Sequence, residues 1–294
     1  MRHAILWTLC WGLIAADLVE VTPLGADRIL VHIDEGHVIH HGKGQKRSAE
    51  RVVLTPVDPI RASDPGTYRL ASADDPRYAE PRAPVQVGRK AKGTDFAWLV
   101  ESWDQAANRA ININPDHAKE HWITLVLPEA MTPGCRYTLD LGGLVEPGTV
   151  AWTWDPATSR SEAIHVNLIG YRLDAREKFA YVYAWLGDLG HLDVRSLVGR
   201  PFHLIDQVNR KKVFTGAVAF RAPFDQAETG HASDSPPHGN FLKADVAECD
   251  FSTFTTPGRY VVSVDGLGCS FPFTIAADIY REPFRTVARG LYHN

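Results

Sequence analysis

The sequence has few cysteines, and their spacing gives no sign of a metal site. The four, Cys10, Cys135, Cys249 and Cys269, include no Cys-x-x-Cys pair, which is the arrangement typical of structural zinc sites. Cys249 and Cys269 fall in the same half of the chain, and a disulfide would need their Cα atoms to lie about 5.5–6 Å apart. The sequence leaves that bridge open, but we expect buried free thiols.

The chain has neither a large net charge nor a long hydrophobic run. The chain carries 31 Lys and Arg against 35 Asp and Glu, a net charge of −4, which gives no electrostatic basis for binding nucleic acid or anionic membranes. The apolar run from Ala4 to Ala16 is shorter than the ~20 residues that span a bilayer. With Arg2 before it and small residues at its end, it predicts a signal peptide over 1–16 and a secreted protein, extracellular or periplasmic. A buried first strand is the alternative.

The familiar catalytic motifs are missing too. No Gly-x-Ser-x-Gly elbow, glycine-rich phosphate loop or His-Glu-x-x-His segment occurs. The histidine cluster His37-Val38-Ile39-His40-His41 has no zinc spacing, so we expect a solvated loop and neither a metal nor a cofactor. The closest carboxylate pairs are Asp74-Asp75 and Glu101 with Asp104. Neighbouring aspartates in a proline-rich loop are expected to stay solvated and to form turns, so we assign no catalytic residue.

Proline and glycine, in contrast, are frequent. The 19 prolines and 23 glycines separate short apolar runs, a pattern that favours an all-β protein, and the length suggests about two domains. We predict a first β-sandwich over 17–154, a polar linker over 155–163 and a second sandwich over 164–277. In the first sandwich, the stretches expected to be loops or irregular are 37–51, 72–92 (with an extended piece at 85–87) and 96–114. The strands predicted for the second are 164–168, 178–183, 201–206, 212–218, 241–251, 258–264 and 270–275.

One short motif occurs in both halves of the chain. Pro133-Gly134 precedes Tyr137, and Pro257-Gly258 precedes Tyr260, each at the start of a predicted strand near the end of a domain. The arrangement is similar to the tyrosine corner of immunoglobulin-like sandwiches, where the hydroxyl bonds to an upstream backbone group. It therefore favours two tandem immunoglobulin-like sandwiches, with repeated use of a common turn as the alternative.

The last residues change to a helical period. Ile279, Phe284, Val287, Leu291 and Tyr292 recur at helical spacing after Asp278, a candidate N-cap. We expect a short C-terminal α-helix whose start, near Ile279 and Phe284, is covered by the second sandwich. The stripe formed by Phe284, Val287, Leu291 and Tyr292 then needs a further partner to pack against.

Eight tryptophans raise the possibility of sugar binding. Exposed indoles offer a flat apolar face with a polar edge, which suits stacking against a sugar ring. Trp98 and Trp103 lie in the stretch predicted to be irregular and are the preferred candidates, with Trp185 also considered. Trp122 lies in an alternating strand and is expected in the core. For the last two candidates, Trp152 and Trp154, packing between the domains is an equally good explanation, since both lie next to the predicted linker.

Several segments of the second half together resemble the family 9 glycoside hydrolases, cellulases and their relatives. They are Val166-Asn167-Leu168-Ile169-Gly170-Tyr171, Asp250-Phe251-Ser252, Phe254 to Tyr260, Asp278-Ile279-Tyr280 and Leu291-Tyr292-His293-Asn294. In that family a small immunoglobulin-like sandwich precedes an (α/α)6 catalytic barrel. The resemblance covers the chain from Ile164 to Asn294. It implies an immunoglobulin-like domain at 164–277, followed over 278–294 by the first helix of a barrel.

The family's catalytic residues have no counterparts here. Its aspartates sit in a Gly-Trp-x-Asp-Ala-Gly-Asp segment and its acid is a glutamate far downstream, and this sequence has neither segment. The resemblance thus implies the non-catalytic N-terminal portion of a secreted enzyme that hydrolyses β-linked glucan or a related polysaccharide. Its partner would be the downstream catalytic domain of the same polypeptide. The alternative is a stand-alone carbohydrate-binding β-sandwich protein that docks polysaccharide.

The purified 294-residue chain is expected to release no reducing sugar from cellulose, xylan or chitosan oligomers above the buffer background. Glycoside hydrolysis needs two carboxyl groups held on either side of the sugar, one of them with a raised pKa, and no segment of the sequence supplies them. Sustained turnover that disappears when a residue of this chain is mutated would contradict this expectation.

Overall fold

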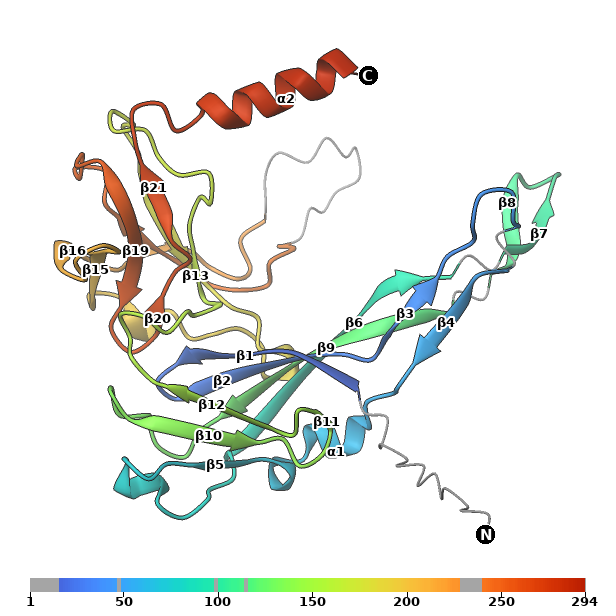
Figure 1. Ribbon diagram of the computed structural model, residues 1–294, viewed down its shortest axis with the longest axis horizontal. Helices are drawn as coiled ribbons and strands as arrows, with labels where there is room; N and C mark the ends of the chain where they lie inside the picture. Colours follow the sequence, from blue (N-terminus) through green and yellow to red (C-terminus); the bar gives the residue numbers. More distant parts are fainter. Residues whose placement is uncertain (1–15, 47–48, 98–99, 114–115, 228–239, 294) are drawn as a thin grey trace, which may run out of the picture.

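A computed structural model describes residues 16–46, 49–97, 100–113, 116–227 and 240–293. Two β-rich units and a C-terminal helix are visible (Figure 1). We call residues 16–154 the first unit, 155–163 the junction segment and 164–277 the second unit. The predicted all-β fold with a short C-terminal helix is confirmed. The predicted signal peptide lies outside the described residues except for Ala16, so it stays a prediction.

Two sheets enclose the core of the first unit. The larger has the order β11-β1-β2-β9-β6 and the smaller the order β12-β10-β5. All neighbouring strands in both are antiparallel except β1 and β11. The strands are β1 (Ala16–Gly25), β2 (Arg28–Asp34), β5 (Arg69–Ala71), β6 (Gln86–Phe96), β9 (His117–Val126), β10 (Arg136–Asp140), β11 (Val145–Glu146) and β12 (Thr149–Thr153). Alternate residues of β2, Ile29, Val31 and Ile33, point into this core, as the period of two requires.

Three stretches of the first unit differ from the prediction. Segment 37–51 was expected to be a loop, but β3 (Gly36–Ile39) pairs there with β4 (Arg51–Leu54). Segment 96–114 contains the hairpin of β7 (Val100–Asp104) and β8 (Arg109–Ile113) instead of irregular structure. The predicted loop 72–92 ends in the long strand β6, whose charged residues hid it. As the edge strand of its sheet, β6 tolerates those charges.

Aspartate followed by proline starts each helical turn between residues 58 and 78. Asp58 caps α1 (Pro59–Ser63), Asp64 caps η2 (Pro65–Thr67) and Asp75 caps η3 (Pro76–Tyr78), with the proline at the first helical position each time. The other 3-10 helices are η4 (Gly187–Leu189) and η5 (Arg195–Leu197). The predicted turn-forming role of Asp75 is therefore confirmed.

The prediction that Asp75 is solvated is wrong, because its side chain is buried. The carboxylate accepts hydrogen bonds from Arg77, at 2.8 and 3.0 Å, from the Tyr137 hydroxyl at 2.6 Å and from the Thr132 hydroxyl at 3.0 Å. The Arg77 guanidinium, helped by these donors, holds the pKa of Asp75 well below its usual range. Asp74 accepts a hydrogen bond from the Arg136 backbone N–H at 2.9 Å.

The second unit is a sandwich of two sheets. Their orders are β13-β14-β18-β17 and β16-β15-β19-β20, with β21 also paired to β19. The strands are β13 (Ile164–His165), β14 (Phe179–Val182), β15 (Pro201–Asp206), β16 (Lys212–Ala217), β17 (Ala219–Ala222), β18 (Val246–Asp250), β19 (Gly258–Val264), β20 (Gly268–Cys269) and β21 (Phe273–Ile275). Each of the seven strands predicted for this unit contains an observed strand, and β15 and β19 have the predicted bounds.

Both predicted tyrosine corners are confirmed. The Tyr260 hydroxyl donates to the carbonyl oxygens of Thr256 and Pro257, at 3.3 and 3.2 Å. The Tyr137 hydroxyl accepts a hydrogen bond from the Thr132 N–H at 2.7 Å. In each case a ring at the start of a strand holds the preceding Pro-Gly turn in place.

The cysteines are also as expected. Cys135, Cys249 and Cys269 are free thiols, and the last two are buried. Burial raises the pKa of Cys249 and of Cys269 to about 12. Both therefore stay as unreactive thiols at neutral pH.

The junction segment, predicted to be a polar linker, makes hydrogen bonds to both units. The Cys269 N–H donates to the Ser159 carbonyl at 2.9 Å, and the Ser161 N–H donates to the Cys269 carbonyl at 2.8 Å. The Ser161 hydroxyl donates to the carbonyl of Leu24, in β1, at 2.8 Å. The junction segment therefore connects the two units through its own hydrogen bonds, to β20 of the second unit and to β1 of the first.

A second contact between the units depends on two glycines, Gly88 and Gly187. A Cβ atom at Gly88 of β6 would lie 2.4 Å from the carbonyl oxygen of Leu186, and a Cβ at Gly187 would lie 2.4 Å from that of Arg89. The Arg89 N–H also donates to the Asp188 side chain at 2.8 Å. Only glycine permits so close an approach of η4 to β6.

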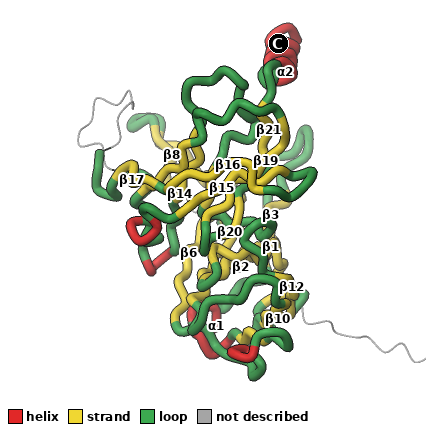
Figure 2. Tube along the Cα trace, turned by 90° about the vertical axis from the view of Figure 1, so that its left-hand side faces the viewer, coloured by secondary structure: helices red, strands yellow, loops and turns green. Residues whose placement is uncertain are grey.

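The helix α2 (Arg281–His293) stands at one end of the molecule and α1 at the other (Figures 1 and 2). None of its residues is buried. Ile279 is half-buried and faces Gly170, but the expected cover on Phe284 is wrong, since 72% of that residue is exposed. Among the described residues, no helix is long and apolar enough to cross a membrane.

Replacing Gly88 by Ala should lower the free energy of unfolding by about 1–3 kcal/mol, the usual cost of overpacking a close contact. The added methyl would meet the Leu186 backbone and the Leu189 side chain, neither of which can move away freely. Urea denaturation measures the change. Gly148→Ala is the control, because its Cβ has no neighbour closer than 3.9 Å and should change stability by less than about 0.5 kcal/mol. Equal effects of the two substitutions would contradict the role of Gly88.

Candidate functional site: an aromatic cleft between the two units

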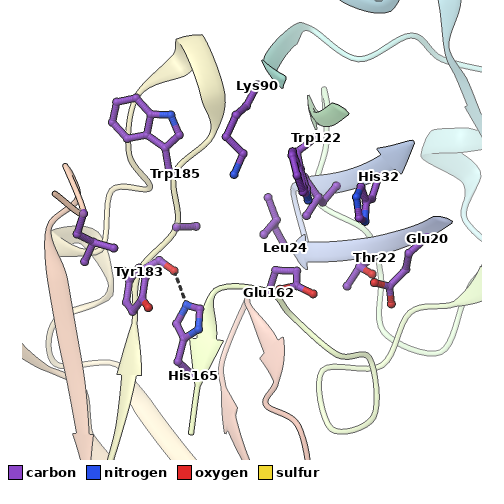
Figure 3. Close-up of a pocket in the computed structure, with 13 residues that line it drawn as sticks. Glu20, Thr22, Leu24, His32, Lys90, Trp122, Glu162, His165, Tyr183 and Trp185 are labelled. Carbon is purple, nitrogen blue, oxygen red and sulfur yellow. Dashed lines mark hydrogen bonds between the residues drawn. The ribbon is translucent and has the colours of Figure 1, made fainter. Parts of the chain in front are cut away.

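A row of four side chains crosses the larger sheet of the first unit. Glu20 of β1 pairs with His32 of β2, His32 with Trp122 of β9, and Trp122 with Lys90 of β6. Since Ile123 next to Trp122 points into the core, the row lies on the opposite face of the sheet. That face is turned toward the second unit (Figure 3).

Both faces of the Trp122 ring are covered within this row. His32 stacks on it with ring centroids 4.7 Å apart and planes inclined by 16°, and Lys90 Nζ lies 4.8 Å from the ring centroid. Because His32 and Lys90 come from the strands on either side of β9, they occupy opposite faces of the indole. Trp122 is half-buried and lines a cleft, so its predicted place in the core is wrong.

The opposite wall of the cleft comes from the second unit. His165 stacks on Tyr183 at 3.9 Å between centroids, and a ring nitrogen, Nε2, lies 3.1 Å from the Tyr183 carbonyl oxygen. Burial lowers the pKa of His165, which favours a neutral ring at neutral pH. Nε2 must then donate to the carbonyl, which leaves Nδ1 as an acceptor. Trp185 follows on the same wall, with 43% of its surface exposed.

Arg160 of the junction segment organises the charges at the base of the cleft. Its guanidinium donates to the carboxylates of both Glu20 and Glu162 and to the Thr22 hydroxyl, and lies 4.5 Å from the centroid of the Phe271 ring. Burial alone would raise the pKa of Glu20, but the hydrogen bonds from Arg160 and Thr22 outweigh it and hold this pKa below its usual value. Glu20 therefore stays ionised and cannot act as a general acid.

The cleft has a volume of about 460 Å³, within the usual range for small-molecule sites. Its lining combines aromatic rings, charged groups and a few aliphatic side chains. The residues are Glu20, Thr22, Leu24, Leu30, His32, Lys90, Trp122, Glu162, His165, Tyr183, Ala184, Trp185 and Leu242.

The other residues singled out in the sequence lie elsewhere. Trp98 is outside the described residues, and Trp103 on β7 is 48% exposed but does not line the cleft. Trp154 is buried in the core of the first unit and Trp152 packs against that core. Both side chains therefore serve packing and are not exposed for binding a sugar. Phe284, Val287, Leu291 and Tyr292 are all exposed on α2.

Two rings of the histidine cluster lie within hydrogen-bond distance of carboxylates. His40 lies 3.0 Å from the Asp95 carboxylate, which raises the pKa of the ring, and His41 lies 2.5 Å from Glu50. In the part of the chain that the structure describes, no three His, Cys, Asp or Glu side chains are grouped as metal ligands.

Sequence reasoning missed the cleft because its two walls are far apart in the chain. The alternation of β2 and β9 does place His32 and Trp122 on the outward face of each strand. Nothing local, however, shows that the two residues are paired or that Trp185 stands opposite them. Only the strand register and the junction segment bring these side chains together.

Residues 159–269 match the sequence profile of a family described as the cellulase N-terminal Ig-like domain. These residues form a cellulase N-terminal Ig-like domain. The resemblance inferred from the sequence is thereby confirmed. Two tandem immunoglobulin-like sandwiches were predicted. The family match supports an immunoglobulin-like fold for the second of them and does not extend to the first. No curated protein sequence is significantly similar to this chain.

Among solved structures, a Bacteroides ovatus GH9 protein is 26% identical over 41% of this chain and 16% of its own, with a TM-score of 0.27. A metagenome-derived glycoside hydrolase family 9 endoglucanase is 23% identical over 40% of this chain and 18% of its own, with a TM-score of 0.31. The N-terminal part of the bacterial S-layer protein SbsC covers 89% of this chain at 12% identity, with a TM-score of 0.29. The chain spans less than a fifth of the length of the two GH9 proteins.

Arg160→Lys should raise the pKa of Glu20 relative to the unmodified protein, because a lysine cannot donate to two carboxylates in the fork geometry of arginine. A carboxyl with a lowered folded-state pKa stabilises the fold above its unfolded-state pKa, and this stabilisation is lost as the pH falls. The variant should therefore lose less stability than the unmodified protein on acidification. NMR titration of the Glu20 carboxyl carbon and unfolding curves across the acid range measure both effects.

Arg172→Lys is the matched control, since the Arg172–Asp174 pair is exposed and neither residue lines the cleft. It should leave the pKa of Glu20 unchanged. An unaltered Glu20 titration in Arg160→Lys would show that Arg160 does not govern the charge of this carboxyl.

Proposed function

We propose that this chain is a non-catalytic module that packs beside the catalytic domain of a secreted family 9 glycoside hydrolase. The cellulase N-terminal Ig-like domain at 159–269 supports the family. The observation that carries the proposal is the uncovered apolar stripe of α2. Its members Phe284, Val287, Leu291 and Tyr292 are 72%, 63%, 74% and 85% exposed.

The stripe has the geometry of a packing surface. Phe284, Val287 and Leu291 follow one another at i, i+3 and i+7 on one face of the helix. Burying each large apolar side chain would contribute roughly 1.5–3 kcal/mol. A helix of 13 residues is close to the length at which an isolated helix is only marginally stable in water. The stripe therefore needs a partner both for burial and for the order of the helix.

We take α2 as the first helix of a helical barrel, and the partner we propose for its stripe is the remaining helices of that barrel, downstream in the same polypeptide. Side chains at i, i+3 and i+7 form the ridges that fit between those of another helix, whereas the second unit leaves them exposed. The substrate class of such an enzyme is β-linked glucan or a related polysaccharide. This part of the proposal depends on the family alone.

A second candidate function is sugar binding by the first unit. The observation in its favour is Trp103, which is 48% exposed on the β7–β8 hairpin (Figure 1). Single exposed aromatic side chains are common on protein surfaces, so this candidate ranks below the packing role.

Amide exchange tests the packing role. In the 294-residue chain, exchange should be fast from Arg289 to the end of α2, and the protein should self-associate weakly through the stripe. When a family 9 catalytic barrel is joined downstream, exchange at the Leu291 amide should slow at least about tenfold, since 1.4 kcal/mol of added stability corresponds to that factor. Hydrogen–deuterium exchange and sedimentation velocity are the measurements.

Leu291→Glu should abolish self-association, and Arg289→Glu, on the polar side of the same helix, should not. The proposal fails if α2 exchanges slowly throughout in a monomeric 294-residue chain. It also fails if joining the barrel leaves exchange at Leu291 unchanged.

A further inference from the structure

The cleft between the units contains one aromatic ring with a free face. Trp122 is sandwiched between His32 and Lys90, and Tyr183 is stacked on His165. Among the described residues, no ring is stacked on Trp185 and no cation lies over it. His191 is its partner in an antiparallel bridge but stacks on Phe224 instead, and 43% of Trp185 is exposed. It stands on the opposite side of the cleft from Trp122 (Figure 3), so a flat ligand in the cleft could stack on it.

The charges of the cleft balance one another. Glu20 and Glu162 carry one negative charge each, and Arg160 donates hydrogen bonds to both. Lys90 supplies a second positive charge, and burial lowers its pKa. Glu20, Glu162 and Lys90 line the cleft, and Arg160 beside it offsets the second carboxylate, so these four groups leave no excess charge to attract an anion or a cation. The cleft favours a neutral ligand.

Several hydrogen-bonding groups around the cleft have capacity left. Within the described residues, the Lys90 ammonium makes no ion pair and the Tyr183 hydroxyl makes no hydrogen bond. His165 Nδ1 is an acceptor by the tautomer derived above, and Glu162 accepts from Arg160 through one oxygen only. Donors and acceptors are thus both present, which suits hydroxyl groups because each hydroxyl donates and accepts.

We propose that this cleft binds a pyranose ring of a neutral oligosaccharide. The apolar C–H face of the sugar stacks on Trp185, and its hydroxyl groups bond to Lys90, Glu162 and His165. The cleft volume of about 460 Å³ accommodates a short oligosaccharide segment rather than a long chain. This site differs from the second candidate function above, which uses Trp103, and it is independent of the packing of α2.

Calorimetric titration of the 294-residue chain with cellohexaose, xylohexaose and mannohexaose tests the proposal. At least one should bind saturably with a Kd near or below about 1 mM, the affinity expected for a few contacts. Trp185→Ala should weaken binding about tenfold, because stacking on an aromatic ring contributes around that factor. Tyr280→Ala is the matched control, as an aromatic residue of similar exposure, 44%, outside the cleft, and should bind like the unmodified protein. Trp103→Ala distinguishes this site from the second candidate function, because loss of binding in that variant would place the sugar on the β7–β8 hairpin.

A second variant and a second measurement guard against a folding defect. Glu162→Gln keeps the size of the side chain and should also weaken binding, with an unchanged melting temperature. In NMR spectra, the indole N–H signal that Trp185→Ala removes should be the one that shifts most when ligand is added. Trigalacturonic acid, which is charged, should bind more weakly than the neutral sugars.

Three outcomes would overturn the proposal. The first is the absence of saturable binding for every neutral sugar. The second is binding that Trp185→Ala leaves unchanged, or that Trp103→Ala removes. The third is a preference for trigalacturonic acid, which would show that an anion is the ligand.

Discussion

The pairing of the junction segment with both units determines the arrangement of the whole molecule. Ser159 and Ser161 exchange backbone hydrogen bonds with Cys269 of β20, while the Ser161 hydroxyl bonds to Leu24 of β1. The junction segment is thus hydrogen-bonded to both units and is not a free linker between them. On the other side, the close approach of η4 to Gly88 prevents the units from turning about this segment. The cleft exists because both contacts hold its walls at a constant separation.

Arg160 connects this architecture to the chemistry of the cleft. It lies in the junction segment, yet its guanidinium reaches Glu20 on one unit and lies against Phe271 of the other. Two carboxylates near each other would otherwise repel and destabilise the closed arrangement. A single fork of donors neutralises both Glu20 and Glu162, so the residue that joins the units also balances the charge of the cleft.

The sequence predicts best where local chemistry and tertiary structure agree. Strands β15 and β19 have the predicted bounds because β-branched and aromatic residues lie between clear turn signals. Strand β6 was missed because Arg89, Lys90 and Lys92 give it the composition of a loop, and only its pairing with β9 orders it. Asp75 was misjudged for the same reason: its donors Thr132 and Tyr137 come from a distant segment.

The cleft, too, is predicted by the sequence only where local patterns determine it. Alternation in β2 and β9 predicts that His32 and Trp122 share an outward face of their strands, but it does not predict that face to border a second unit. Trp103 and Trp185 look alike as exposed tryptophans, at 48% and 43%. They differ only in their surroundings, since Trp185 faces Lys90 and Glu162 across a cleft. Neighbours of this kind are a property of topology, which one sequence does not reveal.

The two proposals make opposite demands on the rest of the protein. The cleft is completed by residues of this chain, and its side chains are held by stacking and ion pairs that exist without a ligand. The helix α2 is not completed here: Pro283 near its start, Gly290 near its end and an exposed stripe leave it short of internal stabilisation. Sugar binding should therefore survive in the 294-residue chain as it stands, while an ordered α2 should depend on a partner. Since the contacts that form the cleft do not include α2, disruption of the helix should leave the cleft and its affinity for sugar unchanged.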